Sequence, residues 1–496
     1  MVDLTGVAAI PYGYANQHGV LVLIDKEDRC EARIYYYKLP APVVITEIQR
    51  SVHPSLRFIR IDEADFKSHL VRIYQEKSAE ELGNLPSTGN HSDGLTLDEL
   101  IPDVDDILDQ DNDAPIIKLL SGLLSEAIRM NASDVHISAT ENSVVIKFRV
   151  DGVLREITRL DRRLSPMVIS RAKVMAKLDI AEKRIPQDGR ISIRLGGREI
   201  DLRVSTMPAQ HGERIVMRIL DKKVGHMALD QLGLSEANYR RLKSALLQPH
   251  GIVLVTGPTG SGKSTSLYSG LSAINDGSKN ILTIEDPVEY QLDNIGQTQV
   301  NIKAGMTFAK GLRSMLRQDP DVIMVGEIRD EETLRVAVQA SLTGHLVLST
   351  LHTNTAVGAI TRLTDMGVEP YLISSTLTAV VAQRLVRRLC PHCKRPHQPT
   401  TAEFAFLGET LQNQERIYSA SETGCDKCHQ QGYKGRIALY EVIPITDELK
   451  QMIHDRLPES TLLQEARKNS KSIQHDGRLK VCAGLTSIEE VARVTG

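Results

Sequence analysis

The stretch VLVTGPTGSGKST, at residues 253–265, has the residue types and spacing of a loop that binds phosphate. It matches the pattern G-x-x-x-x-G-K-[ST] from Gly257 to Ser264. Its glycines let backbone N–H groups turn toward phosphate oxygens, and the start of the following helix adds a positive dipole end. We expect Lys263 to contact the β and γ phosphates of ATP, and Ser264 to bind Mg²⁺. The expected nucleotide-binding residues are Gly257, Pro258, Thr259, Gly260, Ser261, Gly262, Lys263, Ser264 and Thr265.

Two apolar segments end in acidic residues that are candidates for catalysis. The segment ILTIEDPVEY carries Glu285, with Asp286 and Glu289 beyond it. The segment DVIMVGEIRD places Glu327 just past its apolar part. Parallel sheets place catalytic groups at the carboxyl ends of strands, and phosphoryl transfer needs a group that positions the attacking water. We therefore expect Glu285, Glu327 or both to act in catalysis; the alternative for each is a solvated turn residue.

A third segment, TGHLVLSTLHTNTA, places one histidine on either side of an apolar strand. His345 precedes the strand and His352 follows it. We expect His352 to sense the γ phosphate of ATP, with His345 a weaker candidate. The alternative for both is a structural role, which is the commoner one for a single histidine.

Four of the six cysteines form two C-x-x-C pairs with 31 residues between them. Each pair presents two thiolates to one metal, and four thiolates complete a closed tetrahedral zinc shell. The expected zinc ligands are Cys390, Cys393, Cys425 and Cys428. The gap is longer than usual, and free thiols or a redox pair are the alternatives. His392 and His429 lie beside the pairs and are possible substitutes, although exposure is expected for both, and Cys30 and Cys482 are expected to be ordinary thiols.

The periodicity around these motifs predicts a mixed α/β chain of several domains. Apolar runs alternate with helical patterns after about residue 230, which favours a doubly wound sheet around the phosphate-binding loop. Before it, a run of strands with one helical interruption indicates an α+β domain. Asp93 through Asp113 carries nine acids and no Lys or Arg, which is typical of a solvated linker. The expected segments are 1–82 (a small α/β domain), 83–113 (the acidic linker), 114–222 (α+β), 223–389 (the ATPase domain), 390–435 (zinc-binding) and 436–496 (helical).

Composition limits the classes of protein that this chain can represent. Its 496 residues, 41% hydrophobic and 25% charged, are typical of a globular protein. We find neither an uncharged apolar run of membrane-spanning length nor a signal peptide, so we expect a cytoplasmic protein with only indirect membrane contact. A net charge of −3, the absence of Trp and 4% aromatic residues disfavour a nucleic-acid partner.

In their order along the chain, these motifs resemble the secretion ATPase superfamily, which powers type II secretion, type IV pili and DNA uptake. The phosphate-binding loop, TIEDPVE, MVGEIRD and GHLVLSTLHTNTA look like its four signature boxes, and RMNASDVHIS, FRVDG, RIPQDGR and HGERIVMRIL are similar to its pre-motor domain. The resemblance implies a RecA-like motor domain behind a PAS-like α+β domain. It also implies a homohexamer that uses ATP, Mg²⁺ and Zn²⁺.

The resemblance further implies that the pre-motor domain lends arginines to the motor domain of a neighbouring subunit. A guanidinium stabilises charge on the transferring phosphoryl group, and its supply in trans couples hydrolysis to subunit movement. By motif position the candidates are Arg203 and Arg218, with Arg313 and Arg317 on the motor domain itself. The alternative for each is a surface ion pair.

The N-terminal segment IPYGYANQHGVLVLI is similar to the type II secretion branch of this superfamily. In that branch, by resemblance, the first domain docks on an inner-membrane platform protein, which places the ATPase at the cytoplasmic face of the membrane. Retraction motors lack the four-cysteine element, whereas assembly and secretion motors generally carry it. The expected function is ATP-driven pseudopilus assembly for protein export. A pilus assembly motor is the alternative; a ring-shaped nucleic-acid motor and a protein with a vestigial site are remote ones.

Overall fold

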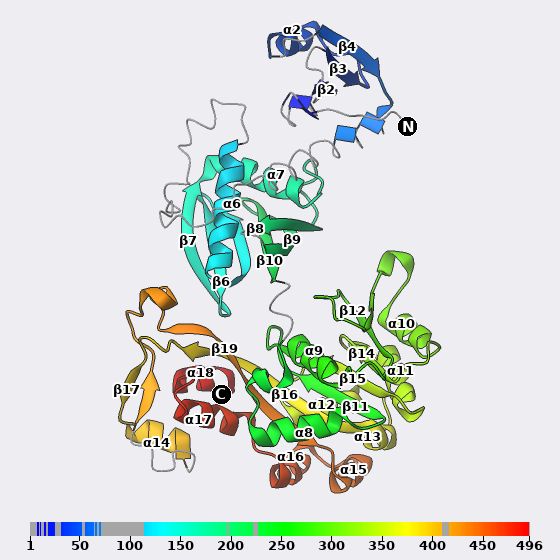
Figure 1. Cartoon of the computed structure of the whole chain (residues 1–496), viewed down its shortest axis with the longest axis vertical. Coiled ribbons are helices and arrows are strands. Elements are labelled where there is room, and N and C mark those ends of the chain that lie inside the picture. Colours follow the sequence, from blue (N-terminus) through cyan, green and yellow to red (C-terminus); the bar gives the residue numbers. More distant parts are fainter. Residues whose placement is uncertain are drawn as a thin grey trace. The chain divides into compact units, whose positions relative to one another are not determined.

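The computed structural model describes residues 7–8, 10, 14–15, 18–24, 31–51, 55–63, 65–66, 69–70, 114–195, 198–221, 227–408 and 416–495. The acidic linker and Cys30 lie outside these residues. The chain divides into two compact units, Met1–Lys222 and Lys223–Gly496 (Figure 1). Among the described residues, no helix combines the length and the apolar composition that a bilayer crossing requires.

The first unit begins with a small four-stranded sheet in the order β1-β2-β3-β4. Its strands are β1 (Val7–Ala8), β2 (Val20–Ile24), β3 (Glu31–Tyr36) and β4 (Ser55–Arg60), and helix α2 spans Pro42–Ser51. Apolar side chains of β2 and β3 form a core with Val44 and Ile48 of α2. Val43, on the opposite side of α2, is 74% exposed. Leu39, which lies just before the helix, is 80% exposed.

A six-stranded antiparallel sheet forms the rest of the first unit, in the order β7-β6-β5-β10-β9-β8. The strands are β5 (Ala132–Ala139), β6 (Ser143–Val150), β7 (Val153–Asp161), β8 (Gln187–Leu195), β9 (Arg198–Ala209) and β10 (Gly212–Asp221). Helices α6 (Ala114–Arg129) and α7 (Ser165–Met175) pack their apolar faces on it, and a short 3-10 turn, η1, spans Arg162–Leu164. Alternation along β9 buries Leu202 and Val204 in this core and turns Arg203 to the opposite face.

The second unit is built on a seven-stranded sheet in the order β13-β12-β14-β15-β11-β16-β19. The first six strands of that order are parallel, and β19 is antiparallel to β16. The strands are β11 (Gly251–Thr256), β12 (Ile281–Glu285), β13 (Gly296–Gln299), β14 (Val322–Val325), β15 (Leu346–Leu351), β16 (Leu377–Leu389) and β19 (Tyr433–Pro444). The predicted P-loop α/β fold is confirmed.

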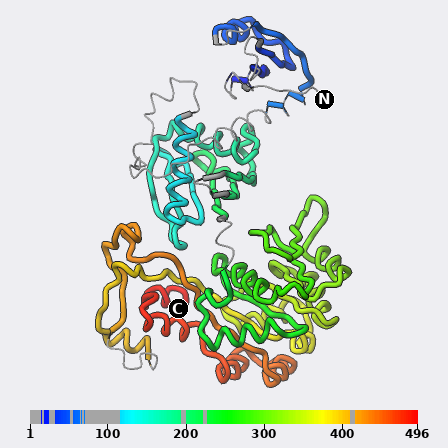
Figure 2. Tube along the Cα trace, in the orientation of Figure 1, coloured from blue at the N-terminus to red at the C-terminus, as the bar shows by residue number. Residues whose placement is uncertain are grey.

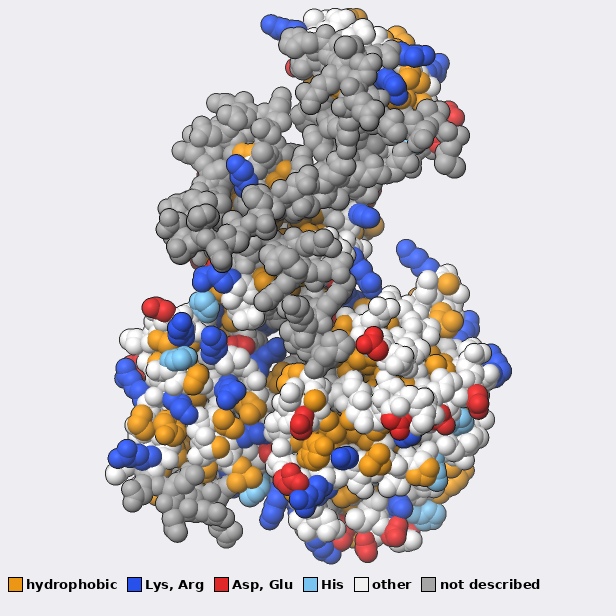
Figure 3. Space-filling view, in the orientation of Figure 1, with side chains coloured by type: hydrophobic (Ala, Val, Ile, Leu, Met, Phe, Trp, Pro, Cys, Tyr) orange, Lys and Arg blue, Asp and Glu red, His pale blue; other side chains and the backbone are white. Residues whose placement is uncertain are grey.

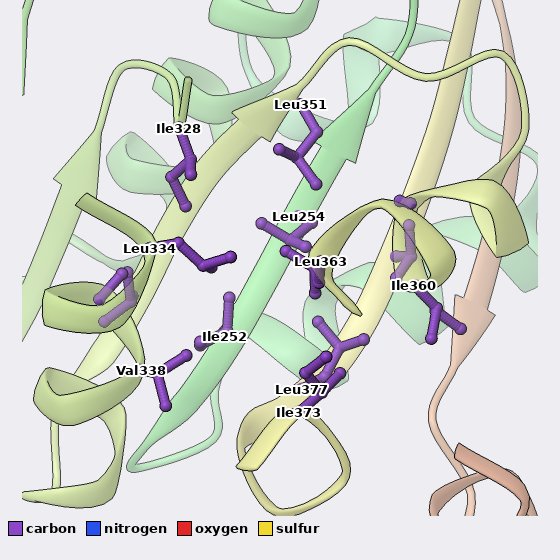
Figure 4. Close-up of a cluster of buried hydrophobic side chains, with 14 of the residues drawn as sticks. Ile252, Leu254, Ile328, Leu334, Val338, Leu351, Ile360, Leu363, Ile373 and Leu377 are labelled. Carbon is purple, nitrogen blue, oxygen red and sulfur yellow. The ribbon is translucent and has the colours of Figure 1, made fainter. Parts of the chain in front are cut away.

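Helices cover both faces of this sheet, so its central strands are buried on both sides. On β11, Ile252 and Leu254 pack with α11, α12 and α13, as Figure 4 shows, whereas Val253 and Val255 pack with α8 and α9. The helices and turns are η2 (Leu229–Leu232), α8 (Glu236–Leu246), α9 (Lys263–Ile274), η3 (Ile302–Ala304), α10 (Phe308–Met315), α11 (Glu331–Leu342), α12 (Ala356–Asp365) and α13 (Pro370–Thr376).

An excursion between β16 and β19 carries the four cysteines. We call residues 390–432 the tetracysteine arm; within it lie β17 (Arg395–His397), α14 (Thr401–Leu407), β18 (Ile417–Ser419) and η5 (Asp426–Cys428). In Figure 2 the chain runs out along β16, in yellow, and returns along β19, in orange. Helices α15 (Asp447–His454), α16 (Glu459–Asn469), α17 (Ile473–Cys482) and α18 (Ile488–Thr495) follow. The sequence pattern missed β19, which falls partly in the segment 436–496 that we expected to be helical. Its pairing partner β16 is separated from it in the sequence by the whole tetracysteine arm.

Candidate nucleotide and metal sites

The phosphate loop, residues 257–265, joins the end of β11 to the start of α9. Gly257, Gly260 and Gly262 have φ angles of +152°, +79° and +88°, which residues with a side chain rarely adopt. A Cβ on Gly257 would lie 2.5 Å from the backbone oxygen of Gln383. The glycines therefore set the curl of the loop and allow it to pass close to β16.

The shape of this loop suits a triphosphate. No atom of the described part of the chain lies within 4 Å of where a Cβ on Gly260 would be, so the loop is open on that side. The hydroxyl of Ser261 is buried and has no hydrogen-bond partner among the residues that the structure describes, which suits a donor for a phosphate oxygen. The hydroxyl-bearing Ser264 is exposed on the first turn of α9, where it is available to Mg²⁺. These features fit ATP and its metal ion.

Lys263 is 8% exposed and folded back onto the loop. Its Nζ donates hydrogen bonds to the carbonyl oxygens of Gly257, at 2.8 Å, and Pro258, at 3.2 Å. Burial lowers its pKa to about 8; Glu327 opposes this shift and Arg384 adds to it. The ammonium of Lys263 therefore lies beside the position that the sequence motif predicts for the phosphates.

ATP affinity should therefore fall as the pH rises through about 8. A bound phosphate needs the protonated lysine, so above the pKa of Lys263 the dissociation constant should rise about tenfold per pH unit. The measurement is a titration with a fluorescent ATP analogue between pH 7 and pH 9. Lys263→Arg keeps its charge over this range and should remove the pH dependence. An affinity that stays constant in the unsubstituted protein would contradict the placement of this lysine.

Glu327 lies in the loop between β14 and α11, close to the phosphate loop. Helix α11 starts here because Asp330 caps it, accepting the backbone N–H of Thr333 at 2.7 Å. The carboxylate of Glu327 is 15% exposed, lies 2.5 Å from Arg329 and is 3.5 Å from Nε2 of His352. Because this carboxylate also acts on the pKa of Lys263, the loop, the acid and the histidine form one site.

Glu285, the other candidate acid, lies in a different environment. It is 4% exposed, and its carboxylate accepts hydrogen bonds from the hydroxyls of Tyr268 and Thr283 and, at 3.2 Å, from the amide of Gln297. Burial raises its pKa, against those three hydrogen bonds. Its oxygens are thus engaged inside the protein, and Asp286 beside it is exposed.

The two histidines of the third box lie at opposite ends of β15. His352 follows the strand, and its side chain is 48% exposed near Glu327. The hydroxyl of Thr353 lies 2.6 Å from that of Thr256, which ties this segment to the last residue before the phosphate loop. His345 precedes β15, and its Nδ1 is 2.8 Å from the carbonyl of Ala340. The parallel strands therefore separate His345 from the phosphate loop.

The two arginines predicted on the first unit belong to a row across three strands, which we call the arginine row. Arg190 on β8 is opposite Arg203 on β9, which is opposite Arg218 on β10. A cavity of about 530 Å³ is lined by these arginines together with Asp134 and Asp188. Arg218 is 2.9 Å from Asp134, so it makes an ion pair. Like charges opposite each other destabilise a sheet, and an anion bound over the row would relieve that cost.

The arginines predicted on the second unit make contacts within it. Arg313 on α10 is 2.7 Å from Glu332 of α11, in an exposed ion pair. Arg317 donates to the backbone oxygen of Arg313 at 3.1 Å. An exposed ion pair is weak, so the side chain of Arg313 can be redirected at small cost.

The four predicted cysteines meet in one cluster, with their sulfurs all within 4.8 Å of one another. The sulfur–sulfur distances are 3.8 Å for Cys390 and Cys425, and 3.7 Å for Cys393 and Cys428. A tetrahedral zinc with bonds of about 2.3 Å places its sulfurs about 3.8 Å apart, so the spacing fits zinc. Burial raises the pKa of Cys428, but backbone N–H groups outweigh it and lower that pKa to about 6. Beside the cluster, His392 is exposed, as expected, whereas His429 is half-buried.

Cys425→Ser should release this metal and loosen the tetracysteine arm. Losing one of four thiolates opens the shell, so zinc should fall from about one ion per chain to a small fraction, and the melting temperature should drop. Elemental analysis and thermal denaturation measure both. Cys482→Ser, which lies outside the cluster, is the matched control. A fully folded protein without zinc would make the cysteines incidental.

Sequence reasoning missed several residues that the fold brings to these sites. Arg384 of β16 acts on the pKa of Lys263 and donates to the backbone oxygen of Asn354 at 2.6 Å. Arg329 pairs with Glu327. The RIPQDGR motif contained Arg190, but only the pairing of β8 with β9 reveals that it belongs to the arginine row.

Two family models together match most of the chain. One, described as type II/IV secretion system protein, matches residues 109–493, and the other, described as a domain of GSPII protein E, matches residues 9–74. The type II secretion system ATPase E of Vibrio cholerae is 51% identical over 490 residues, covering 99% of this chain and 97% of that protein. The type II secretion system protein E of Pseudomonas aeruginosa is 51% identical over 486 residues, covering 98% and 96%.

Solved structures share the fold. The ATPase DotB of Legionella pneumophila aligns with a TM-score of 0.56 at 23% identity, covering 76% of this chain and 94% of that one. The pilus retraction motor PilT with bound ADP aligns with a TM-score of 0.52 at 26% identity, covering 76% and 96%.

Proposed function

The chain belongs to the family of type II/IV secretion system proteins, and we therefore propose that six copies form a ring that hydrolyses ATP to assemble a pseudopilus and export proteins. As a member of this family it is an ATP hydrolase that serves secretion. The ring, the pseudopilus and a place at the cytoplasmic face of the inner membrane are the proposed part. The observation that supports ATP hydrolysis at this site is the cluster of Lys263, Glu327 and His352.

In the proposed mechanism, the phosphate loop and Lys263 hold the β and γ phosphates, and Glu327 orients the attacking water and accepts its proton. Mg²⁺, held near Ser264 when bound, would neutralise charge on the phosphates. Glu327 is favoured over Glu285 because its carboxylate lies beside Lys263 and is not enclosed by buried donors. His352, whose Nε2 is 3.5 Å from Glu327, would respond to the γ phosphate.

The arginine row would complete the site of a neighbouring subunit. Arg203 and Arg218 would face the triphosphate of that neighbour, with Arg190 beside them. The ion pair of Arg218 with Asp134 holds this side chain in place until an anion competes for it. Such an exchange would couple ATP binding to movement between subunits.

Two findings, the N-terminal domain match and the names of the relatives, support a type II secretion motor over a pilus assembly motor. The match of residues 9–74 to a domain of GSPII protein E and the relatives of about 50% identity named type II secretion system protein E support a secretion motor over a pilus assembly motor. On the face drawn in Figure 3, Lys and Arg side chains are interspersed with Asp, Glu and apolar ones, which gives no support to a nucleic-acid motor.

The test is whether the platform protein stimulates ATP turnover. Turnover should be slow alone and rise with the cytoplasmic domain of an inner-membrane platform protein. Leu39→Asp, a change on the exposed apolar surface of the N-terminal domain, should weaken that stimulation about thirtyfold and leave basal turnover intact. Arg57→Asp, at an exposed position of β4, is the control. Stimulation by single-stranded DNA instead, or by a pilus platform alone, would overturn the secretion assignment.

A further inference from the structure

Three buried polar side chains meet beneath the phosphate loop. They are Ser266 of α9, Gln383 of β16 and Tyr440 of β19, which are 4%, 2% and 0% exposed, and we call them the polar junction. The Ser266 hydroxyl donates to Oε1 of Gln383 at 2.9 Å and lies 2.9 Å from the Tyr440 hydroxyl. Because serine has a single donor, Tyr440 must donate to Ser266. Burial raises the pKa of Tyr440, which keeps its hydroxyl protonated.

Gln383 of the polar junction lies close to two glycines of the phosphate loop, Gly257 and Gly262. A Cβ on Gly257 would lie 2.5 Å from the backbone oxygen of Gln383, and one on Gly262 would lie 2.9 Å from its Nε2. Gln383 thus lies against both glycines, while its Oε1 holds Ser266 one turn into α9. The start of the helix and the loop before it are therefore fixed against the same side chain.

The strands behind the junction hold it rigidly. Gln383 and Tyr440 are direct partners in the register of β16 and β19. The backbone N–H of Tyr440 donates to Asp476 of α17 at 2.9 Å, and its carbonyl accepts the side-chain amide of Asn238 at 3.1 Å. Three elements from distant parts of the chain thus determine where the Tyr440 hydroxyl lies.

We propose that Ser266, Gln383 and Tyr440 are positioning residues for ATP hydrolysis. They fix the first turn of α9, and with it the direction in which Lys263 and Ser264 point toward the phosphates. Buried polar groups are costly unless fully bonded, and this set is bonded only when α9 lies in this one position. The inference rests on the proposed role of the phosphate loop.

A double-mutant cycle on the full chain tests the proposal. Tyr440→Phe should lower kcat/KM for ATP about fivefold, the factor that one net hydrogen bond supplies. Ser266→Ala should lower it further, because it removes the hydrogen bonds to both Gln383 and Tyr440. The loss should appear mainly as a higher KM, because the loop holds the phosphates before and during the reaction. The double variant should lose little more than Ser266→Ala alone, because that change already removes the hydrogen bond that Tyr440→Phe removes.

Tyr433→Phe is the matched control, because it removes a hydroxyl of the same strand that lies 2.9 Å from Ser487. The melting temperature of Tyr433→Phe should shift by about as much as that of Tyr440→Phe, but its kcat/KM should stay unchanged. Unchanged kcat/KM in Ser266→Ala, additive losses, or an equal loss in Tyr433→Phe would each overturn the proposal. Lys263→Ala in the same assay separates the two ideas: if it stays active, the loop assignment fails; if it is inactive while the cycle shows no effect, only the junction fails.

Discussion

We expect Lys263→Ala to abolish ATP turnover, with a loss of at least about a hundredfold, while the protein remains folded. The ammonium is buried against the carbonyls of Gly257 and Pro258 and next to Glu327, so truncation to alanine removes a charge from the centre of the site. Removing a charge whose burial is costly should change stability little. Turnover and circular dichroism measure the two effects. Lys243→Ala, an exposed lysine of α8, is the control, and retained turnover in Lys263→Ala would remove the loop assignment.

The same variant tests whether the site is shared between subunits. Arg203→Ala should also be inactive, because the neighbouring subunit then lacks its arginine. When the two inactive proteins are mixed and reassembled, some sites combine an intact Lys263 with an intact Arg203. Random mixing in a ring should restore about one quarter of the full turnover. No recovery in mixed rings would confine the catalytic residues to a single subunit.

Glu327→Gln should stop hydrolysis but leave ATP bound. The amide keeps the shape of the side chain and cannot accept a proton, so kcat should fall by a factor of about a hundred to ten thousand. The ATP dissociation constant should change little, since the loop and Lys263 remain. Single-turnover kinetics and an ATP-binding titration provide the two readouts.

Glu285→Gln is the comparison that assigns the catalytic acid. Its carboxylate accepts hydrogen bonds from Tyr268, Thr283 and Gln297. An amide has a single acceptor oxygen, so its NH2 group would face at least one of these donors. We expect a loss of stability of about 1–3 kcal/mol and a smaller loss of kcat than for Glu327→Gln. If Glu285→Gln slows the chemical step as much, the catalytic role passes to Glu285.

The sequence alone determined the class of fold and the family. Both follow from residues adjacent in the chain: an apolar strand, a glycine-rich turn and a helix start make a recognisable unit around Lys263. The two C-x-x-C pairs likewise predicted a four-sulfur cluster, because the two cysteines of each pair are brought together by a single turn of the chain. The roles of Lys263, Glu327, His352, Arg203 and Arg218 remain predictions.

Tertiary structure alone decided which side chains share an environment. Gln383 and Tyr440 lie far apart in the sequence yet are partners in β16 and β19, and no local pattern encodes that pairing. Strand register likewise aligned Arg190 with Arg203. Burial distinguishes Glu285 from Glu327, although each lies at the carboxyl end of an apolar strand. Motifs report the conformation of neighbouring residues, whereas register and burial arise from the packing of distant segments, which a single sequence does not contain in local form.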